Sequence, residues 1–370
     1  MININFPGRK FVNILLPRKT KENLFRAYNL LNRRYSSILN NPVLYKKPNR
    51  LSHPKYLGIC LTTRCNLRCT ICDREGFKNS DMDFENVIKL RNPIKYAKMI
   101  DLTGWGEAIL YPKYADVVEY IFSINNKKKL ISQTTNGALS DQYGDLLKGR
   151  LQRLVISLNA ATPETYNREM RGGNFDKTIS SVKAFLARLT SEDRKRARLH
   201  FVVHINNYKE MPLFVELAKS LNVSQVSFGQ YMSNGSDTEK NTLLNIKSQY
   251  NDILRKVEEA SKKFGVEVFC RRFGENLGLS TNNCMFPYEW CFVLTNGDIT
   301  PCCYLGDITM GNIFDDSFES VWFGKKMQKI RKSRYLPSCS LCAPFHPFDN
   351  PVCHFTSKYN LKRIGEKVDI

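Results

Sequence analysis

The chain has 370 residues, of which 42% are hydrophobic and 25% are charged, and this composition is typical of a globular protein with a substantial buried core. It contains no apolar run near the ~18 residues of a membrane span, and the N-terminal stretch FVNILLP is too short for a signal peptide, so we expect a cytoplasmic protein. The 56 Lys and Arg residues outnumber the 35 Asp and Glu residues, and the net charge of +21 favours an anionic partner such as phosphate, nucleic acid or acidic lipid.

Residues 1–52 are expected to form a basic amphipathic N-terminal segment. Eleven basic residues and one acidic residue lie within the first fifty positions. Between Lys21 and Leu39 the apolar residues share one stripe of a helix: Leu24, Tyr28, Leu31, Tyr35 and Ile38. Such a helix can lie on an anionic membrane surface, which would make the protein membrane-peripheral, or it can dock on the body of the protein with its charges solvated.

From residue 53 to residue 270, strand-like apolar runs alternate with helical ones. Strands are expected at 56–63, 99–108, 130–137, 153–159, 199–205 and 223–229, with a short seventh at 266–270. Helices are expected at 175–189, 209–221 and 238–264. The alternation predicts an α/β fold whose parallel sheet forms a barrel or a partial barrel. In such sheets the chemistry collects in loops that follow the carboxyl ends of the strands.

Residues 271–370 have a different character. Seven of the twelve cysteines lie here among Pro, Gly and aromatic residues: Cys284, Cys291, Cys302, Cys303, Cys339, Cys342 and Cys353. This pattern predicts a small module that is stapled by metal and has little core of its own. Asn296-Gly297 is a strong signal for a two-residue hairpin turn, and a helix is expected to start near Ser317.

Three cysteines after the first expected strand, Cys65, Cys69 and Cys72, have the spacing C-x3-C-x2-C. In a reducing compartment such cysteines indicate metal ligands or catalytic thiols rather than disulfides. A structural zinc site is normally bound by four protein ligands, whereas a 4Fe-4S cluster held by three thiolates keeps one iron free to bind another ligand. Arg64 and Arg68 flank the cysteines and would favour their thiolate forms.

This motif and its placement resemble the radical S-adenosylmethionine (SAM) superfamily. The resemblance implies a partial (β/α)6 barrel over 53–270, a 4Fe-4S cluster on the three cysteines, and SAM as a cofactor. By the same resemblance Gly104, Gly106 and Glu107 match a G-G-E-P segment that binds the methionine amino group, although Ala108 replaces the proline. The remaining candidates for SAM binding are Asn136 in the TTNG stretch, Ser157 at the ribose and Arg171 at the methionine carboxylate. Asn159 stands where an aspartate is usual.

The C-terminal module resembles the SPASM or twitch domains that hold auxiliary 4Fe-4S clusters. By this resemblance the ligands are Cys284, Cys302, Cys339 and Cys342, and Cys291 could replace one of them. Phe348 stands where the full SPASM pattern has a cysteine, so the shorter twitch form with a single cluster is expected. A four-cysteine zinc ribbon is the alternative that spacing alone leaves open.

The resemblance implies a reaction in which SAM is reductively cleaved to a 5′-deoxyadenosyl radical that takes a hydrogen atom from the substrate. We expect a small polar substrate, sugar-like or phosphorylated, whose alcohol is oxidised with the auxiliary cluster as electron acceptor. Arg271 and Arg272 would suit an anionic group of such a substrate. An electron donor such as flavodoxin or ferredoxin is also expected.

Three alternatives stay open. In an epimerase, Cys291, Cys303 or Cys353 would return a hydrogen atom. A peptide maturase is less favoured, because 52 residues before the barrel are fewer than the about 80 of a typical precursor-binding domain with its own core. A basic nucleic-acid-binding protein with structural zinc would show aromatic residues among its basic ones, but Tyr28 and Tyr35 lie on the apolar stripe, so nucleic acid is not expected.

Two histidines, His200 and His204, lie four apart on one expected strand and therefore on one face. Hydrogen-bonded core histidines are commoner than catalytic ones, and the sequence assigns no catalytic base.

Overall fold

The computed structural model describes residues 52–72, 78–124, 131–231, 243–270, 273, 286–301 and 308–333. The expected N-terminal helix and six of the seven C-terminal cysteines lie outside these ranges, among them the proposed ligands Cys284, Cys302, Cys339 and Cys342. Arg271, Arg272 and Phe348 also lie outside them.

Ten strands in the described residues form one sheet with the order β12-β11-β10-β1-β3-β4-β5-β7-β8-β9. The strands are β1 (Tyr56–Ile59), β3 (Met99–Asp101), β4 (Ile131–Thr135), β5 (Leu151–Ser157), β7 (Ala197–Val203), β8 (Gln225–Gln230), β9 (Glu267–Phe269), β10 (Trp290–Val293), β11 (Asp298–Thr300) and β12 (Gly311–Asn312). Every neighbouring pair from β10 to β9 is parallel, and β11 and β12 join as antiparallel strands. Because parallel strands end at the same edge, the loops that follow β1, β3, β4, β5 and β7 meet there.

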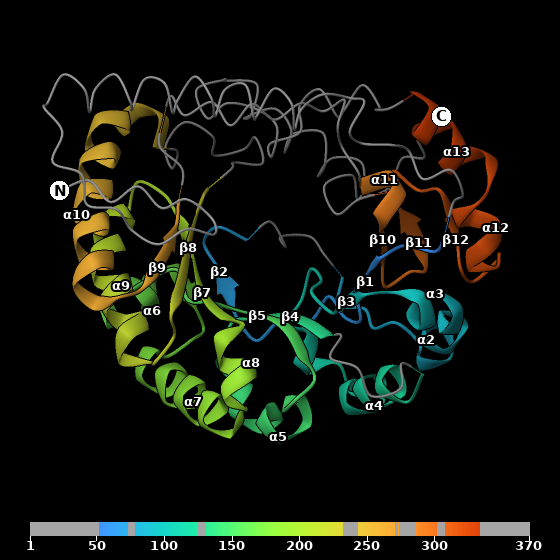
Figure 1. The fold of residues 1–370 in the computed structure, drawn as a ribbon, viewed down its shortest axis with the longest axis horizontal. Helices are drawn as coiled ribbons and strands as arrows, with labels where there is room; N and C mark the ends of the chain where they lie inside the picture. Colours follow the sequence, from blue (N-terminus) through green and yellow to red (C-terminus); the bar gives the residue numbers. More distant parts are fainter. Residues whose placement is uncertain are drawn as a thin grey trace, which may run out of the picture.

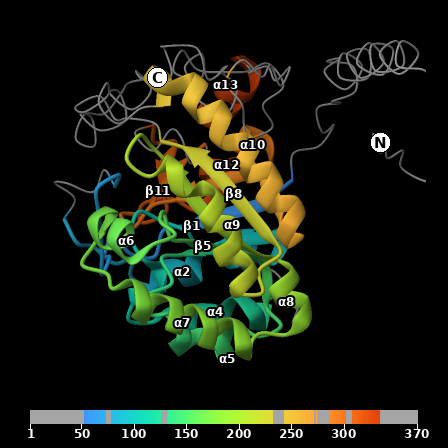
Figure 2. The same ribbon diagram turned by 90° about the vertical axis from the view of Figure 1, so that its left-hand side faces the viewer.

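The helices lie in an arc around the outside of the strands (Figure 1). They are α2 (Phe84–Lys89), α3 (Arg91–Tyr96), α4 (Tyr114–Ile124), α5 (Gly144–Leu147), α6 (Pro163–Glu169), α7 (Phe175–Arg188), α8 (Ser191–Lys195), α9 (Met211–Ser220), α10 (Lys247–Phe264), α11 (Phe286–Glu289), α12 (Phe318–Trp322) and α13 (Lys325–Ser333). Figure 2 shows α9 and α10 side by side over β8. The arrangement confirms the expected α/β fold with a mostly parallel sheet.

Helix α7 illustrates how the sequence sets one of these layers. The side chain of Asn174 caps its first turn by accepting a hydrogen bond from the Lys177 amide. Its buried residues recur at helical spacing: Thr178, Ser181, Val182, Phe185 and Leu186. They pack into the same core as the fully buried side chains of the neighbouring strands, including Leu154 and Ile156 of β5.

The strands and helices predicted from periodicity are present, with shifted ends. The first strand stops at Ile59 rather than at residue 63 and the second at Asp101 rather than at residue 108, because the chain there leaves the sheet to form the loops of the candidate site. Helix α10 begins at Lys247, and residues 238–242 of the longer expected helix lie outside the described ranges.

The hairpin around Asn296-Gly297 has a three-residue loop, so the two-residue turn expected from the sequence is wrong. The Leu294 amide donates to the Asp298 carbonyl at 2.9 Å, which leaves residues 295–297 as the loop. Gly297 has φ +83°, the left-handed position that three-residue hairpins give to glycine.

This hairpin extends the sheet of the barrel. Strand β10 pairs in parallel with β1, with Leu57 opposite Cys291, and Tyr56 stacks on Trp290 with ring centroids 4.7 Å apart. The boundaries at 52/53 and 270/271 stay predictions. No helix in the described part of the chain is long and apolar enough to cross a membrane.

Candidate functional site

The three cysteines lie on the loop that leaves β1, which we call the cysteine loop (residues 60–72). Cys65 and Cys69 are half-buried and Cys72 is exposed. The Leu67 amide lies 3.5 Å from Cys65 Sγ, and the Cys72 amide donates to the Cys69 carbonyl at 3.1 Å. The fold thus brings the three sulfur atoms onto one short segment at the edge where the parallel strands end.

The electrostatics of this loop fit a positively charged metal cluster. Burial, together with repulsion from Cys72 and Cys65, raises the pKa of the Cys69 thiol to about 12. Three bare thiolates are therefore unfavourable together, whereas bound metal ions would stabilise them.

The arrangement suits a cluster better than one ion. No three His, Cys, Asp or Glu side chains in the described ranges converge tightly enough to hold a single metal ion. A 4Fe-4S cluster does not need such convergence, because each cysteine binds a different iron atom of the cube.

A second segment, residues 102–108, packs directly beneath the cysteine loop. A Cβ atom at Gly106 would lie 2.3 Å from the Arg64 carbonyl oxygen, and one at Gly104 would lie 2.5 Å from Cys60 Sγ. The Glu107 amide donates to the same Arg64 carbonyl at 2.7 Å. These glycines permit close packing of two loops of the protein, and their contact with a ligand stays a prediction.

Glu107 places a buried carboxyl group at this junction. It is 4% exposed, and burial raises its pKa to about 7 despite the hydrogen bond from the Asn136 amide to Oε2 at 2.7 Å. Its Oε1 has no hydrogen-bond partner within the described residues. An unsatisfied buried carboxylate oxygen is a strong acceptor for a cationic donor such as an ammonium group.

Asn136, which follows β4, connects Glu107 to the cysteine loop. Its side-chain Nδ2 lies 3.8 Å from Cys65 Sγ and donates to Asn66 Oδ1 at 2.8 Å, while its backbone amide binds Glu107. Its Oδ1 accepts from the Ala138 amide at 3.0 Å. Three of the proposed site segments, namely the cysteine loop, residues 102–108 and Asn136, are therefore joined by direct contacts.

Arg171 reaches the cysteine loop through a feature that periodicity did not predict. A two-stranded antiparallel ladder pairs β2 (Arg68–Cys69) with β6 (Met170–Arg171), and Arg171 Nε donates to the Arg68 carbonyl at 3.1 Å. Its positive charge lowers the pKa of Cys69 against the larger effect of burial. Arg64, which we expected to support the thiolates, instead pairs with Asp81 at 2.5 Å.

Ser157 ends β5 at the same edge of the sheet, half-buried, and its hydroxyl lies 3.4 Å from Asn159 Oδ1. Asn159 is 5% exposed with φ +52°, a strained conformation for a residue other than glycine. Its Oδ1 accepts from the Val202 amide at 2.8 Å. No direct contact joins Ser157 to the cysteine loop among the described residues.

A buried group that sequence reasoning missed lies behind the loop. Thr70 Oγ1 donates to Glu169 Oε2 at 2.5 Å, and His204 Nε2 lies 3.3 Å from the same oxygen. Burial alone would raise the pKa of Glu169, but contacts with His204, Thr70 and Arg168 bring it down to about 2. No local pattern reveals Glu169, because Thr70 lies 99 positions away in the sequence.

The other candidate histidine and cysteine sit in the core. His200 Nδ1 lies 2.8 Å from Ser227 Oγ on the adjacent strand, and burial lowers its pKa. Cys291 is completely buried within β10, where burial raises the pKa of its thiol strongly. The roles proposed for Cys291, as a replacement cluster ligand or as a hydrogen donor, stay predictions.

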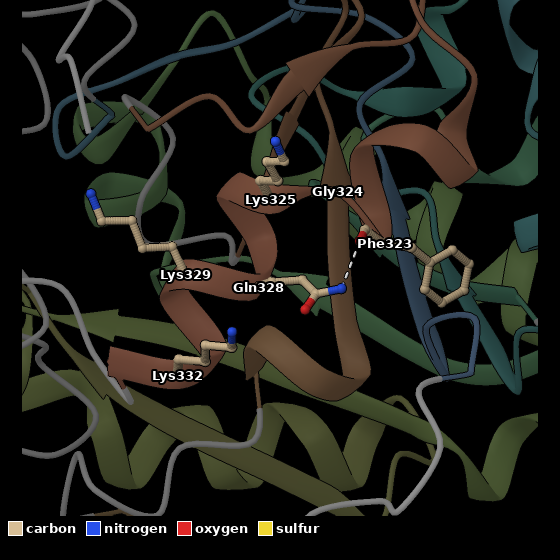
Figure 3. Close-up of a pocket in the computed structure, with 6 residues that line it drawn as sticks. All are labelled: Phe323, Gly324, Lys325, Gln328, Lys329 and Lys332. Carbon is tan, nitrogen blue, oxygen red and sulfur yellow. Dashed lines mark hydrogen bonds between the residues drawn. The ribbon is translucent and has the colours of Figure 1, made fainter.

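A lysine-lined hollow of 710 Å³ lies on α13. Lys325, Lys329 and Lys332 project from this helix, and Gln328 Nε2 donates to the Phe323 carbonyl at 3.0 Å (Figure 3). Gly324 completes the lining. The cysteine loop follows β1, whereas the hollow lies on α13, so this basic hollow is a separate feature.

Two family models match the chain. One, described as the radical SAM superfamily, matches residues 59–218, and the other, described as an iron-sulfur cluster-binding domain (SPASM), matches residues 284–343. The first contains the cysteine loop and the second contains Cys284, Cys302, Cys339 and Cys342. These matches confirm the expected family and favour iron-sulfur clusters over the zinc ribbon; the twitch form stays a prediction.

Curated relatives include proteins named probable GTP 3′,8-cyclase. That of Methanococcus aeolicus is 26% identical over 229 residues, which cover 60% of this chain and 71% of the relative. That of Methanocaldococcus jannaschii is 32% identical over 173 residues, which cover 45% of this chain and 55% of the relative. The second match thus spans about half of the relative's length.

Solved structures share the fold at low sequence identity. Streptococcus suis SuiB bound to S-adenosylmethionine is 18% identical with a TM-score of 0.62, and the match covers 91% of this chain and 88% of SuiB. The enzyme anSMEcpe with bound AdoMet is 18% identical with a TM-score of 0.59, covering 80% of this chain and 85% of that chain.

Proposed function

Because this chain belongs to the radical SAM superfamily and carries a SPASM iron-sulfur domain, we propose that it oxidises an alcohol group of a small anionic substrate. The superfamily implies a 4Fe-4S cluster and SAM, and the SPASM domain implies auxiliary iron-sulfur binding. The observation that carries the proposal is the contact chain from Cys65 through Asn136 to the buried, half-satisfied Glu107.

In this proposal Cys65, Cys69 and Cys72 hold the first cluster and leave one iron for SAM. The cofactor supplies a 5′-deoxyadenosyl radical that takes a hydrogen atom from the substrate. Glu107 binds the methionine amino group, for which its free Oε1 is a suitable acceptor. The match to family motifs supports Arg171 at the methionine carboxylate and Ser157 at the ribose.

Oxidation of the alcohol then removes a proton and one electron from the substrate radical. The electron passes to the auxiliary cluster, for which Cys284, Cys302, Cys339 and Cys342 are the proposed ligands. The substrate loses two hydrogens in total and becomes a carbonyl compound.

An anionic substrate, sugar-like or phosphorylated, is supported by two observations. The chain carries a net charge of +21, which favours an anionic partner. The relatives named as GTP cyclases also point to a phosphorylated small molecule. The likeness to SuiB supports the scaffold and leaves peptide modification as the competing reaction.

We also propose an electron donor and a cellular location for this protein. A reduced flavodoxin or ferredoxin would supply the electron that cleaves SAM. We propose that the enzyme works in the cytoplasm and that its basic residues 1–52 make peripheral contact with an anionic membrane.

The test uses the full chain, purified and reconstituted without oxygen, with SAM and dithionite. GTP, a hexose phosphate and a nucleotide-linked hexose serve as substrates, and mass spectrometry follows 5′-deoxyadenosine and the substrate. The proposal expects a product with two hydrogens fewer than one of these substrates. In D2O, a product of unchanged composition that gains solvent deuterium would overturn oxidation in favour of epimerisation.

Iron analysis supplies the matched control. Changing Cys65, Cys69 and Cys72 together to alanine is expected to remove about four irons per chain and abolish 5′-deoxyadenosine formation while the auxiliary iron stays. Unchanged iron in this variant would exclude the cysteine loop as the cluster site.

A further inference from the structure

Glu169 lies at the end of α6 with its side chain buried beneath the cysteine loop. It is 4% exposed, yet three polar side chains converge on its carboxylate. Thr70 Oγ1 donates to Oε2 at 2.5 Å, Arg168 Nε donates to Oε1 at 2.8 Å, and His204 Nε2 lies 3.3 Å from Oε2. Oε1 thus accepts a hydrogen bond from Arg168 on the same helix and Oε2 accepts one from Thr70 on the cysteine loop, while His204 Nε2 lies close to Oε2 without forming a hydrogen bond within the described residues.

Backbone hydrogen bonds also join Glu169 and its neighbour to the cysteine loop. The Thr70 amide donates to the Glu169 carbonyl at 2.9 Å, and Cys69 pairs with Met170 in the β2–β6 ladder. Thr70 thus holds Glu169 with both its amide and its hydroxyl, immediately after Cys69 in the chain.

The opposite side of this group is fixed to the sheet. The His204 amide donates to Asn207 Oδ1 at 2.8 Å, and the Asn206 amide donates to His204 Nδ1 at 3.3 Å. Because Nδ1 accepts there, a neutral His204 carries its proton on Nε2, facing Glu169. Asn207 Nδ2 in turn donates to the carbonyls of Asn159 and Val202, at the ends of β5 and β7.

We propose that Glu169 is a positioning residue that holds Cys69, through Thr70, in place for cluster binding. The inference rests on the proposed role of Cys65, Cys69 and Cys72 as cluster ligands. Glu169 does not touch the cluster in this scheme. It connects the exposed end of the cysteine loop to the strand ends of the sheet, so that the loop is ordered before iron binds and binding requires less loss of conformational freedom.

A second threonine–glutamate pair in the same fold provides a matched control. Thr162 Oγ1 donates to Glu210 Oε1 at 2.6 Å, and the Ala161 amide donates to Glu210 Oε2 at 2.7 Å. This pair has the same chemistry and a similar geometry, but its hydrogen bonds within the described residues do not reach the cysteine loop. Removing either hydroxyl deletes one charge-assisted hydrogen bond. Removing that of Thr162 also deletes the cap of α6, in which Oγ1 accepts from the Thr165 amide at 3.4 Å, so the control is the more demanding of the two changes.

The experiment compares Thr70→Val, Thr70→Ser and Thr162→Val in the reconstituted full chain. A ferrous chelator is added, and two signals are followed: total iron released and the electron paramagnetic resonance signal of the reduced protein that responds to SAM. For Thr70→Val we expect this signal to decay about three- to tenfold faster than in the wild type, the range that one net hydrogen bond represents. Thr70→Ser keeps the donor and should restore the wild-type rate, and Thr162→Val should leave it unchanged.

Hydrogen exchange on the iron-free full chain gives a readout independent of the cluster. Amides of residues 68–72 should exchange faster in Thr70→Val than in the wild type, while amides of β4 and β5 keep their protection. Glu169→Gln, which keeps the shape but weakens the acceptor, should change exchange in the same direction.

The outcomes separate this inference from the proposed function. If the wild type shows no SAM-responsive signal, the cluster assignment fails and the inference fails with it. If the wild type shows the signal but Thr70→Val behaves like Thr162→Val in both iron loss and exchange, Glu169 does not position the loop, and the proposed function stands.

Discussion

Glu107 has an ionisable side chain that is almost completely buried. Burial raises its pKa to about 7. The ionised carboxylate, which predominates above that pH, is therefore less favourable in the folded state than in the unfolded state and lowers the free energy of unfolding. Such a cost is common where a protein keeps an acceptor ready for a ligand. The residue is therefore expected to favour function at the expense of stability.

Glu107→Gln should stabilise the SAM-free protein at pH 8 and not at pH 5. A raised folded pKa means that stability is lost as the pH rises from the unfolded value of 4.5 to about 7, and Gln removes that loss, which is about 3 kcal/mol. Thermal unfolding of both proteins across this range measures the effect. The same variant should bind SAM more weakly by calorimetry. Equal stability gains at pH 5 and pH 8 would contradict the assignment.

Cys291→Ala should leave the iron content unchanged, whereas Cys302→Ala should lower it. Cys291 is completely buried and faces Leu57 across the β1–β10 pair, and its thiol stays protonated because burial raises its pKa. Iron and sulfide analysis of both reconstituted variants decides the point. Loss of iron from Cys291→Ala alone would restore it as a ligand.

The residue scale also shows what the sequence could reveal about the site. Cys65, Cys69 and Cys72 were found because ligands on one loop have a fixed spacing. Glu107 and Asn136 were found by resemblance. Glu169 was not found, because its partners Thr70 and His204 come close only through pairing of β2 with β6 and the placement of β7.

At the scale of elements, the cysteine loop and the 102–108 segment behave as one packed layer. The two segments pack this closely because residue 106 has no side chain: a Cβ there would lie 2.3 Å from the Arg64 carbonyl oxygen and 2.7 Å from the Thr62 carbonyl oxygen. Both are backbone atoms, which cannot rotate out of the way as the end of a side chain can. The geometry of the loop is therefore set by its neighbour in the sheet as well as by its own sequence.

Gly106→Ala should displace the cysteine loop and cost about 1–3 kcal/mol of stability, as overpacking does. Iron binding should fall with it. Gly149→Ala is the control, because a Cβ there meets nothing within 4 Å although its φ of +76° adds strain. Chemical denaturation and iron content report the two effects. Normal iron binding in Gly106→Ala would show that the layer can adjust.

Elements were predictable to different degrees for physical reasons. Apolar periodicity located β5, β7, α7 and α9 because their buried faces repeat regularly. The β2–β6 ladder has two residues in each strand, too short for any period. The hairpin was recognised, but its loop length depends on how Leu294 and Asp298 pair across it.

At the scale of the whole molecule, the start of the barrel is tied to the C-terminal helices. Trp322 Nε1 donates to the Ser52 carbonyl at 2.9 Å, and His53 Nε2 lies 3.0 Å from Glu319 Oε1. His53 also stacks on Tyr96, with ring centroids 4.6 Å apart. Segments more than 260 positions apart thus stabilise each other.

Glu319→Gln should lower the melting temperature at pH 7, and the difference should vanish in acid. Burial alone would raise the pKa of Glu319, but His53 and Asn92 hold it below 4.5. A depressed folded pKa contributes stability above the unfolded value and loses it as the pH falls through the folded value. Melting curves of both proteins from pH 7 down to about pH 2 check this. A constant difference across that range would exclude the ionised Glu319 carboxylate as the cause.

The pairing of β10 with β1 has a consequence for any attempt to divide the protein. Strand β1 pairs with β3 on one side and with β10 on the other, so one edge of β1 would be unpaired without β10. A chain ending at residue 270 would expose a row of unpaired amide and carbonyl groups beside the apolar residues Leu57 and Ile59, which is a template for strand addition between molecules. We expect such a fragment to aggregate, as size-exclusion chromatography would show, and the barrel and the auxiliary module to be inherited and expressed as one unit.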